Sequence, residues 1–183
     1  MPKQAGVDAR AAAASVVAAV LGNRGNLDQA LGSVELSGRD RALCQALAFG
    51  ALRTHERNRW ILGQLMDKPL RKRERSIEAL LSVALFALTE SERPDYAVVS
   101  VSVDAAKALG LPRLAGLVNA ILRRFLRERT ELLAAAAEHE PARWQHPQWL
   151  IDAVRADWPD HWQSILTAAN AQPPMWLRVN QQQ

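Results

Sequence analysis

Apolar side chains recur at helical spacing along most of the chain, most clearly over residues 114–127, LAGLVNAILRRFLR. Read at 100° per residue, this stretch has one apolar side and one basic side. The apolar side contains Leu114, Leu117, Val118, Ile121, Leu122 and Phe125, and the basic side contains Arg113, Arg123, Arg124 and Arg127, with Asn119 near Arg123. We therefore predict a helix, continuing to about Glu138, that buries one face in a core and presents guanidinium groups on the other.

Capping residues indicate further helices in the first half of the chain. The candidate caps are Asp8, Asn26, Ser37 and Ser76. Gly22 is a suitable stop for the first helix, and Ser37 has capping-box spacing to Asp40. Residues 42–52 are apolar nearly all round, which is typical of a helix at the centre of an all-helical domain. The helix after Ser76 has an apolar stripe over residues 77–88.

Residues 97–103, AVVSVSV, fit a strand and a helix equally well on local signals. Valine and serine alternate, and β-branched residues favour strands. Pro94 suits a first helical turn, however, and residues 105–109 continue at helical spacing. Because the neighbouring sequence offers no second strand for pairing, we predict a helix.

The C-terminal part has a different pattern. Pro141 ends the long helix, and His146-Pro147 and Trp158-Pro159 each place a proline where a short helix can begin, at about 147–157 and 159–170. Residues 175–180 then alternate as a strand does. A single strand has nothing to pair with. We therefore expect this chain to be a fragment cut inside a following domain.

Composition limits the class of protein. Of the 183 residues, 49% are hydrophobic, so a sizeable core can form. No apolar run is long enough to predict a transmembrane helix. Asp8 and Arg10 interrupt the N-terminal stretch, which therefore lacks a secretory signal pattern, and we expect a cytoplasmic protein. The single cysteine, Cys44, excludes an intramolecular disulfide framework and lies in an apolar helix, where we expect a buried, non-catalytic thiol.

Charge and tryptophan are unevenly distributed. Residues 1–130 hold 20 Lys and Arg against 13 Asp and Glu, a net charge of +7, whereas residues 131–183 hold 3 against 6, a net charge of −3. Five of the six tryptophans lie in the last forty residues. This break near 130–145 indicates a basic module followed by a different one. A basic module points to nucleic acid or another polyanion.

The sequence offers no recognisable catalytic arrangement. The four histidines and Cys44 do not have metal-ligand spacing, and we predict no metal site. No Gly-rich phosphate loop follows a strand, and no nucleophile elbow is present. The residues alone thus favour a binding module over a catalyst.

Three stretches together resemble the N-terminal region of the RsmB family of bacterial small-subunit (16S) rRNA cytosine-C5 methyltransferases. They are residues 37–53 (SGRDRALCQALAFGALR), residues 116–125 (GLVNAILRRF), and residues 146–150 with 173–180 (HPQWL and PPMWLRVN). The first two also suit the wider NusB-like family of helical RNA-binding domains, whereas the third is specific to the methyltransferases.

The resemblance implies an all-α, NusB-like helical bundle over residues 1–140. Residues 141–183 would form a helical linker and the first strand of a truncated ferredoxin-like domain. In full-length members of the family, a further domain binds S-adenosylmethionine, and a cysteine thiolate attacks C6 of the cytosine before C5 is methylated. Cys44 matches no catalytic position, and the cofactor loop is absent. This chain alone is therefore expected neither to bind S-adenosylmethionine nor to methylate RNA.

In NusB-like proteins the helical domain meets RNA, so the resemblance implies two partners: small-subunit rRNA, and the missing catalytic domain in cis. We expect a monomer. The candidate phosphate contacts are Arg10, Arg39, Arg41, Arg123, Arg124 and Arg127. Arg10 lies in a first helical turn, where a cation is unfavourable, and such local conflicts sometimes occur at functional sites.

Other features are more ambiguous. The charged run at 68–75, KPLRKRER, matches no family motif, and we expect a solvated loop. Trp149, Trp176 and Arg178 could contact RNA, but for both tryptophans we favour packing against neighbouring domains. Two alternatives to an RNA-positioning module remain. One is a NusB-type transcription antitermination factor, and the other is a domain that only clamps its catalytic neighbour.

Overall fold

The structure is a computed structural model that describes residues 6–22, 25–171 and 178. In this part of the chain every regular element is a helix, which confirms the predicted all-α class. The α-helices are α1 (Val7–Leu21), α2 (Leu27–Gly32), α3 (Gly38–Arg53), α4 (His55–Leu65), α5 (Arg75–Glu90), α6 (Asp95–Ala108), α7 (Ala115–Glu138), α8 (Glu140–Trp144), α9 (Gln148–Asp157) and α10 (Trp162–Asn170), and the short 3-10 helices are η1 (Lys72–Glu74) and η2 (Pro112–Leu114).

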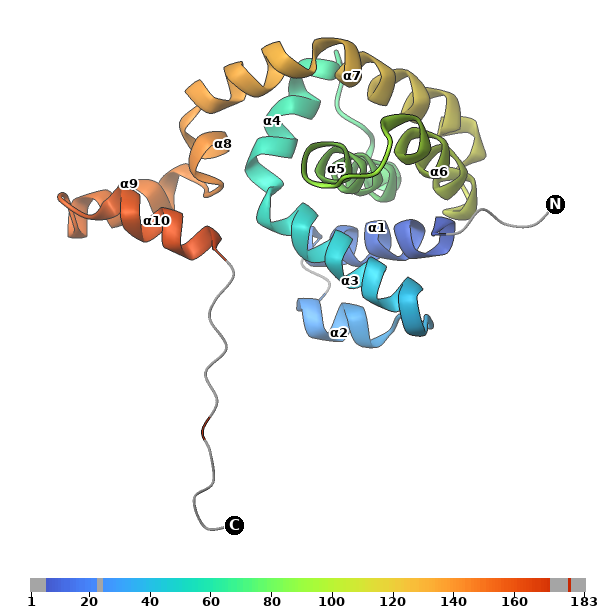
Figure 1. The fold of residues 1–183 in the computed structure, drawn as a ribbon, viewed down its shortest axis with the longest axis horizontal. Helices are drawn as coiled ribbons and strands as arrows, with labels where there is room; N and C mark the ends of the chain where they lie inside the picture. The colour runs from blue at the N-terminus through green and yellow to red at the C-terminus, as the bar shows by residue number, and fades with distance from the viewer. Residues whose placement is uncertain (1–5, 23–24, 172–177, 179–183) are drawn as a thin grey trace.

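Helix α5 is the centre of the bundle, and α1, α3, α4, α6 and α7 pack around it (Figure 1). It is buried over most of its length, including Ile77, Leu81 and Leu85, whose side chains are inaccessible to solvent. The prediction that residues 42–52 form the central helix is wrong. Helix α3 packs against α1 and α5 on one side only and leaves Phe49 44% exposed. Its apolar residues include small alanines on the solvent side, so the pattern did not show which side is buried.

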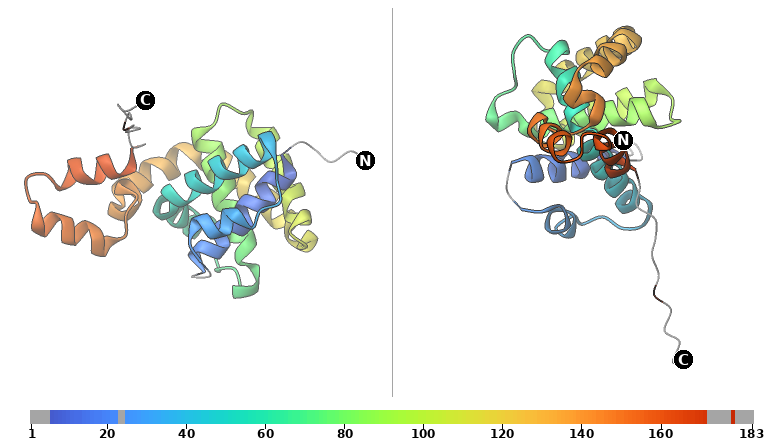
Figure 2. Two further views of the ribbon diagram at one scale, coloured as in Figure 1. Left: turned by 90° about the horizontal axis from the view of Figure 1, so that it is seen from below. Right: turned by 90° about the vertical axis from the view of Figure 1, so that its left-hand side faces the viewer.

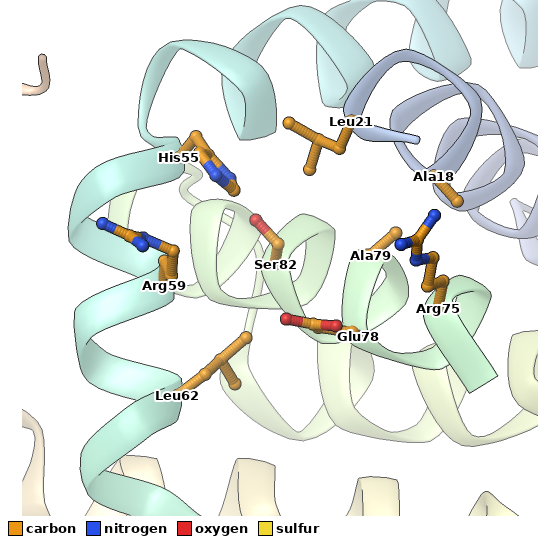
Figure 3. Close-up of a pocket in the computed structure, with 9 residues that line it drawn as sticks. All are labelled: Ala18, Leu21, His55, Arg59, Leu62, Arg75, Glu78, Ala79 and Ser82. Carbon is orange, nitrogen blue, oxygen red and sulfur yellow. The ribbon is translucent and has the colours of Figure 1, made fainter. Parts of the chain in front are cut away.

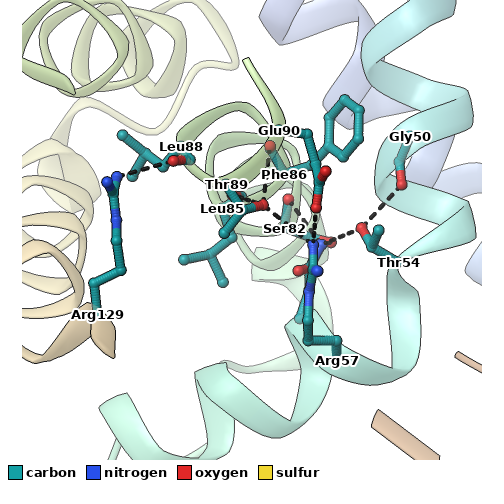
Figure 4. A network of polar contacts seen from close by, with 11 residues as sticks. Gly50, Thr54, Arg57, Ser82, Leu85, Phe86, Leu88, Thr89, Glu90 and Arg129 are labelled. Atoms are coloured by element: carbon teal, nitrogen blue, oxygen red, sulfur yellow. Dashed lines mark hydrogen bonds and ion pairs between the residues drawn. The ribbon is translucent and has the colours of Figure 1, made fainter. Parts of the chain in front are cut away.

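A buried polar cluster joins α3 and α4 to α5 (Figure 4). The Asn58 side chain, which is inaccessible to solvent, donates to Oγ1 of Thr54 at 2.9 Å and to the backbone oxygen of Ser82 at 3.2 Å. Thr54 in turn donates to the backbone oxygen of Gly50 at 2.9 Å. Because a buried donor is costly unless it is paired, the two bonds of Asn58 Nδ2 favour one placement of the start of α4 against α5.

The predicted helix boundaries are partly confirmed. Asn26 caps α2 through a capping box with Gln29, and Gly22 follows α1 as predicted. Asp8, in contrast, lies inside α1, whose cap is Gly6, and Ser37 precedes α3 without a side-chain capping bond. Residues 97–103 lie in helix α6, as predicted. The strand expected at 175–180 lies outside the described residues, except for Arg178.

Helix α7 arches across one side of the bundle and carries the chain to α8 (Figure 1). Helix α8 packs against α4 and α7, where Ala142 is 2% exposed, and the rings of Trp60 and His139 lie 5.9 Å apart. The pair α9 and α10 projects away from the bundle (Figure 2). An edge-to-face contact between Trp144 and Trp162, 5.0 Å between centroids, joins this pair to α8.

Candidate nucleic-acid interface

The basic face of α7 forms as the sequence predicts, but its three arginines have different environments. Arg123 is exposed, and its Nε donates to Oδ1 of Asn119 at 3.1 Å. Arg127 is exposed on the same side of the helix, one turn further on. Neither guanidinium has an acidic partner within the described residues. These two positive charges are therefore available to an anionic ligand.

Arg124 lies to one side of that face and is partly engaged. Its Nε pairs with Glu128 at 3.0 Å, and its Nη1 donates to the backbone oxygen of Leu65 at 3.3 Å. The second bond ties α7 to the C-terminal end of α4, where unpaired helix carbonyls attract a cation. Arg124 thus has a structural contact in addition to its 41% exposed side chain.

The structure corrects the expectation for Arg10, whose side chain is buried with 1% exposure. The first turn of α1 faces the core, and Nη1 of Arg10 donates to the backbone oxygen of Gly6 at 3.2 Å. Burial, and then the nearby charge of Arg93, lowers the pKa of Arg10. A guanidinium in this position cannot reach a phosphate in solvent, so Arg10 is not part of the interface.

Arg39 and Arg41 lie on the first turn of α3. Arg39 is exposed, whereas Arg41 is half-buried and donates to the backbone oxygen of Val34 at 3.3 Å. Helices α2 and α3 lie on the opposite side of the bundle from α7 (Figure 1). The structure therefore does not bring Arg39 and Arg41 together with the α7 arginines into one surface.

The charged run between α4 and α5, in contrast, lies beside α7. Arg113, just before α7, forms an ion pair with buried Glu74 at 2.8 Å, and Arg124 contacts Leu65 just before the run. The backbone N–H of Arg71 donates to Glu74 and, with Arg113, holds the pKa of that carboxyl below its usual range. The exposed cations of the run are Lys68, Arg71, Lys72, Arg73 and Arg75. Only these tertiary contacts place them next to α7, so no local signal in the sequence could have shown it.

The tryptophan expectation is also changed. Trp149 on α9 is 70% exposed, so the packing expected for it does not form within the part of the chain that the structure describes. Trp176 lies outside the described residues. Arg178 is exposed.

A cavity of about 260 Å³ lies between α1, α4 and α5 (Figure 3). His55, Arg59, Arg75, Glu78 and Ser82 contribute polar groups to its wall. Burial lowers the pKa of His55, so its imidazole is neutral at pH 7, and Arg59 is paired with Glu56 at 2.7 Å. The cavity thus combines groups of both signs without a nucleophile and base in contact, and we assign no chemistry to it.

Cys44 is buried, and burial raises the pKa of its thiol, which opposes formation of a reactive thiolate. Among the described residues, no three His, Cys, Asp or Glu side chains come together to hold a metal ion. Within the same residues, no helix is both long and apolar enough to cross a membrane.

The fold is a helical bundle of the NusB type with an exposed basic helix. The chain belongs to the NusB family, whose model matches residues 7–127. Residues 146–183 match the model of the ferredoxin-like domain of RsmF/B-like methyltransferases. Both matches confirm the resemblance and the fold class predicted from the sequence.

Curated relatives align with most of this chain. The chain is 38% identical over 176 residues to ribosomal RNA small subunit methyltransferase B of Klebsiella pneumoniae, covering 95% of this chain and 41% of the relative. It is 40% identical over 173 residues to the protein of that name from Serratia proteamaculans, covering 93% and 40%. It is 40% identical over 146 residues to the protein of that name from Escherichia coli, covering 80% of this chain and 34% of the relative. The chain thus spans between about a third and two fifths of the length of these relatives.

Proposed function

We propose that this chain is the RNA-binding, substrate-positioning N-terminal part of an S-adenosylmethionine-dependent small-subunit rRNA cytosine-C5 methyltransferase. The observation that carries this proposal is the α7 face, where Arg123 and Arg127 are exposed and have no acidic partner among the described residues. Arginines of this kind contact phosphates and position RNA without reading its sequence. The charged run at 68–75, which lies beside α7, would extend the same surface.

The matches to relatives support this assignment. These relatives are named as rRNA methyltransferases, and the match at 146–183 belongs to methyltransferases of the RsmF/B type. Methyl transfer and S-adenosylmethionine binding belong, in this proposal, to a catalytic domain outside these 183 residues. The proposed partners are small-subunit rRNA and that domain in cis. We further propose a monomer in the cytoplasm.

A NusB-type antitermination factor is the second candidate, because the match to the NusB family covers residues 7–127. The match at 146–183 favours the methyltransferase assignment, since it describes a domain of such enzymes. The third candidate, a domain that only clamps its catalytic neighbour, predicts little RNA affinity for this chain.

The test is fluorescence anisotropy of the 183-residue chain with a labelled small-subunit rRNA hairpin over a range of salt concentrations. Arg123, Arg124 and Arg127 are replaced together by alanine. Loss of three phosphate contacts should weaken binding and reduce the slope of log K against log salt by roughly 2, at about 0.7 per contact to single-stranded RNA.

A matched control removes three exposed arginines that lie elsewhere. Arg53, Arg59 and Arg143 lie on α3, α4 and α8 and give the same change in net charge when replaced by alanine. This variant should keep most of the slope. If both triple variants lose affinity equally, only net charge matters, and if the unchanged chain does not bind, RNA delivery does not belong to this module.

A further inference from the structure

A groove of about 660 Å³ runs between α6 and α7, on the side of α7 that carries Arg123. One stripe of each helix lines it, and the residues used below are Tyr96, Val99, Val103, Asn119, Arg123 and Leu126. Val99 is buried, and Val103 and Leu126 are half-buried. The groove therefore has an apolar floor beside the proposed RNA-binding face.

Tyr96 stands at the rim of this groove with 78% of its surface exposed. It is the second residue of α6, and its ring has no aromatic partner among the described residues. An exposed ring contributes little to the stability of the bundle. A flat aromatic surface beside an apolar floor is, however, what an unstacked base requires.

The charges in the groove are balanced except for one cation. Asp95 pairs with Arg129 at 2.9 Å, and Asp104 pairs with Lys107 at 2.7 Å. Arg123 has no acidic partner within the described residues and donates only its Nε, to Oδ1 of Asn119. The Nη1 and Nη2 N–H groups of Arg123 and the side-chain amide N–H groups of Asn119 therefore remain available. They match phosphate oxygens and the acceptors on a base edge, respectively.

We propose that this groove holds one unstacked nucleotide of single-stranded RNA, with its base on Tyr96 and its phosphate at Arg123. This inference rests on the proposed RNA-binding function and adds that the bound RNA is single-stranded. A duplex has no unstacked base to place on the ring. An apolar peptide helix fits less well, because charged side chains of both signs line the rims.

The sequence permits a direct measurement, because Tyr96 is the only tyrosine. The chain labelled with 3-fluorotyrosine gives one ¹⁹F resonance, which reports on this ring alone. Adding a 12-nucleotide single-stranded RNA should shift that resonance, whereas a blunt duplex of the same sequence and inorganic tripolyphosphate should not. An equal shift with tripolyphosphate would show recognition of charge instead of a base and would overturn the inference.

Anisotropy with the same single-stranded RNA tests the energetic contribution. Tyr96→Ser should weaken binding by about tenfold, within the range for loss of one base–aromatic stack, and Tyr96→Phe should retain the wild-type affinity. Trp158→Ser is the control, because Trp158 is also exposed but lies at the C-terminal end of α9. Binding that is sensitive to the α7 arginines but unaffected by Tyr96→Ser would refute the groove and leave the proposed function intact. Absence of all RNA binding would refute both.

Discussion

At the scale of single residues, Gly50 leaves room for the Phe86 ring between α3 and α5. The tip of the Phe86 ring rests on Gly50, and a Cβ at this position would lie 2.1 Å from Cζ of Phe86. In an open helix, Gly→Ala would stabilise by about 1 kcal/mol. Here the ring must move, and overpacking costs about 1–3 kcal/mol. We therefore expect Gly50→Ala to lower the free energy of unfolding by up to about 2 kcal/mol in urea denaturation.

Gly63 provides the matched control, because it lies in helix α4 and a Cβ added there would have no neighbouring atom within 4 Å. Gly63→Ala should stabilise by about 0.5–1 kcal/mol, as helix propensity alone predicts. The effects of Gly50→Ala and Phe86→Ala should not add. In the Phe86→Ala background the ring is gone, so Gly50→Ala no longer causes a clash. If Gly50→Ala is as stabilising as Gly63→Ala, the Phe86 ring does not restrict the space at this position.

At the scale of elements, two arginines on α7 differ in their roles: Arg129 makes tertiary contacts, whereas Arg127 is proposed to contact RNA. Nη2 of Arg129 donates to the backbone oxygen of Leu88 near the end of α5, and it pairs with Asp95 on α6, both at 2.9 Å. Arg127 has no such contact in the described part of the chain. Arg129→Ala should therefore destabilise by about 1–2 kcal/mol. It should weaken RNA binding less than Arg127→Ala does, because Arg129 is itself paired and its loss only leaves Asp95 unpaired beside the groove. Arg127→Ala should change stability by less than about 0.5 kcal/mol and weaken RNA binding.

Both variants carry the same change in charge, so thermal unfolding and RNA anisotropy on the pair distinguish the two roles. The outcome that contradicts this assignment is a pair of variants with equal RNA affinity. In that case the exposed guanidinium of Arg127 has no role in RNA binding.

The same contrast shows how far the sequence could predict the candidate interface. Periodicity placed Arg123, Arg124 and Arg127 on the exposed side of a helix, because burial of the apolar stripe leaves only one arrangement. It could not predict that Arg10 is buried, since a helix turn near a chain end gives no sign of which side faces the core. Tyr96 was missed because a single aromatic residue has no periodic signal, and its exposure depends on how α6 meets α7.

Among the helices, a clear apolar stripe or a true capping residue was enough for a correct prediction. Helix α7 and the short helix after Asn26 were predicted correctly, and helix α6 was identified because a lone strand had no partner. The central position of α5 was missed. Its stripe and the all-apolar stretch of α3 both suggest burial, and only packing against α1, α4, α6 and α7 distinguishes them.

At the scale of the whole molecule, the relation between α8 and its neighbours decides where the helical module ends. The sequence places that boundary at residue 140, which stays a prediction. Helix α8, just after it, packs against α4 and α7 and also contacts α9. Two side-chain contacts join α8 to the pair α9 and α10. Trp144 on α8 contacts Trp162 on α10, and Glu140 on α8 forms an ion pair with Arg155 on α9. Helix α8 thus contacts both parts, and geometry alone does not show which part depends on it.

A pair of truncated chains tests this dependence. A chain ending at Gln145 keeps α8, whereas a chain ending at His139 exposes the surface that Ala142 covers. We expect the longer chain to unfold cooperatively and to exceed the shorter one in stability by about 1–2 kcal/mol, because apolar area is lost with α8. Its RNA salt slope should equal that of the full chain, since the α7 face is unchanged. Equal stability of the two chains would instead show that the bundle does not need α8, and the boundary at 140 would stand.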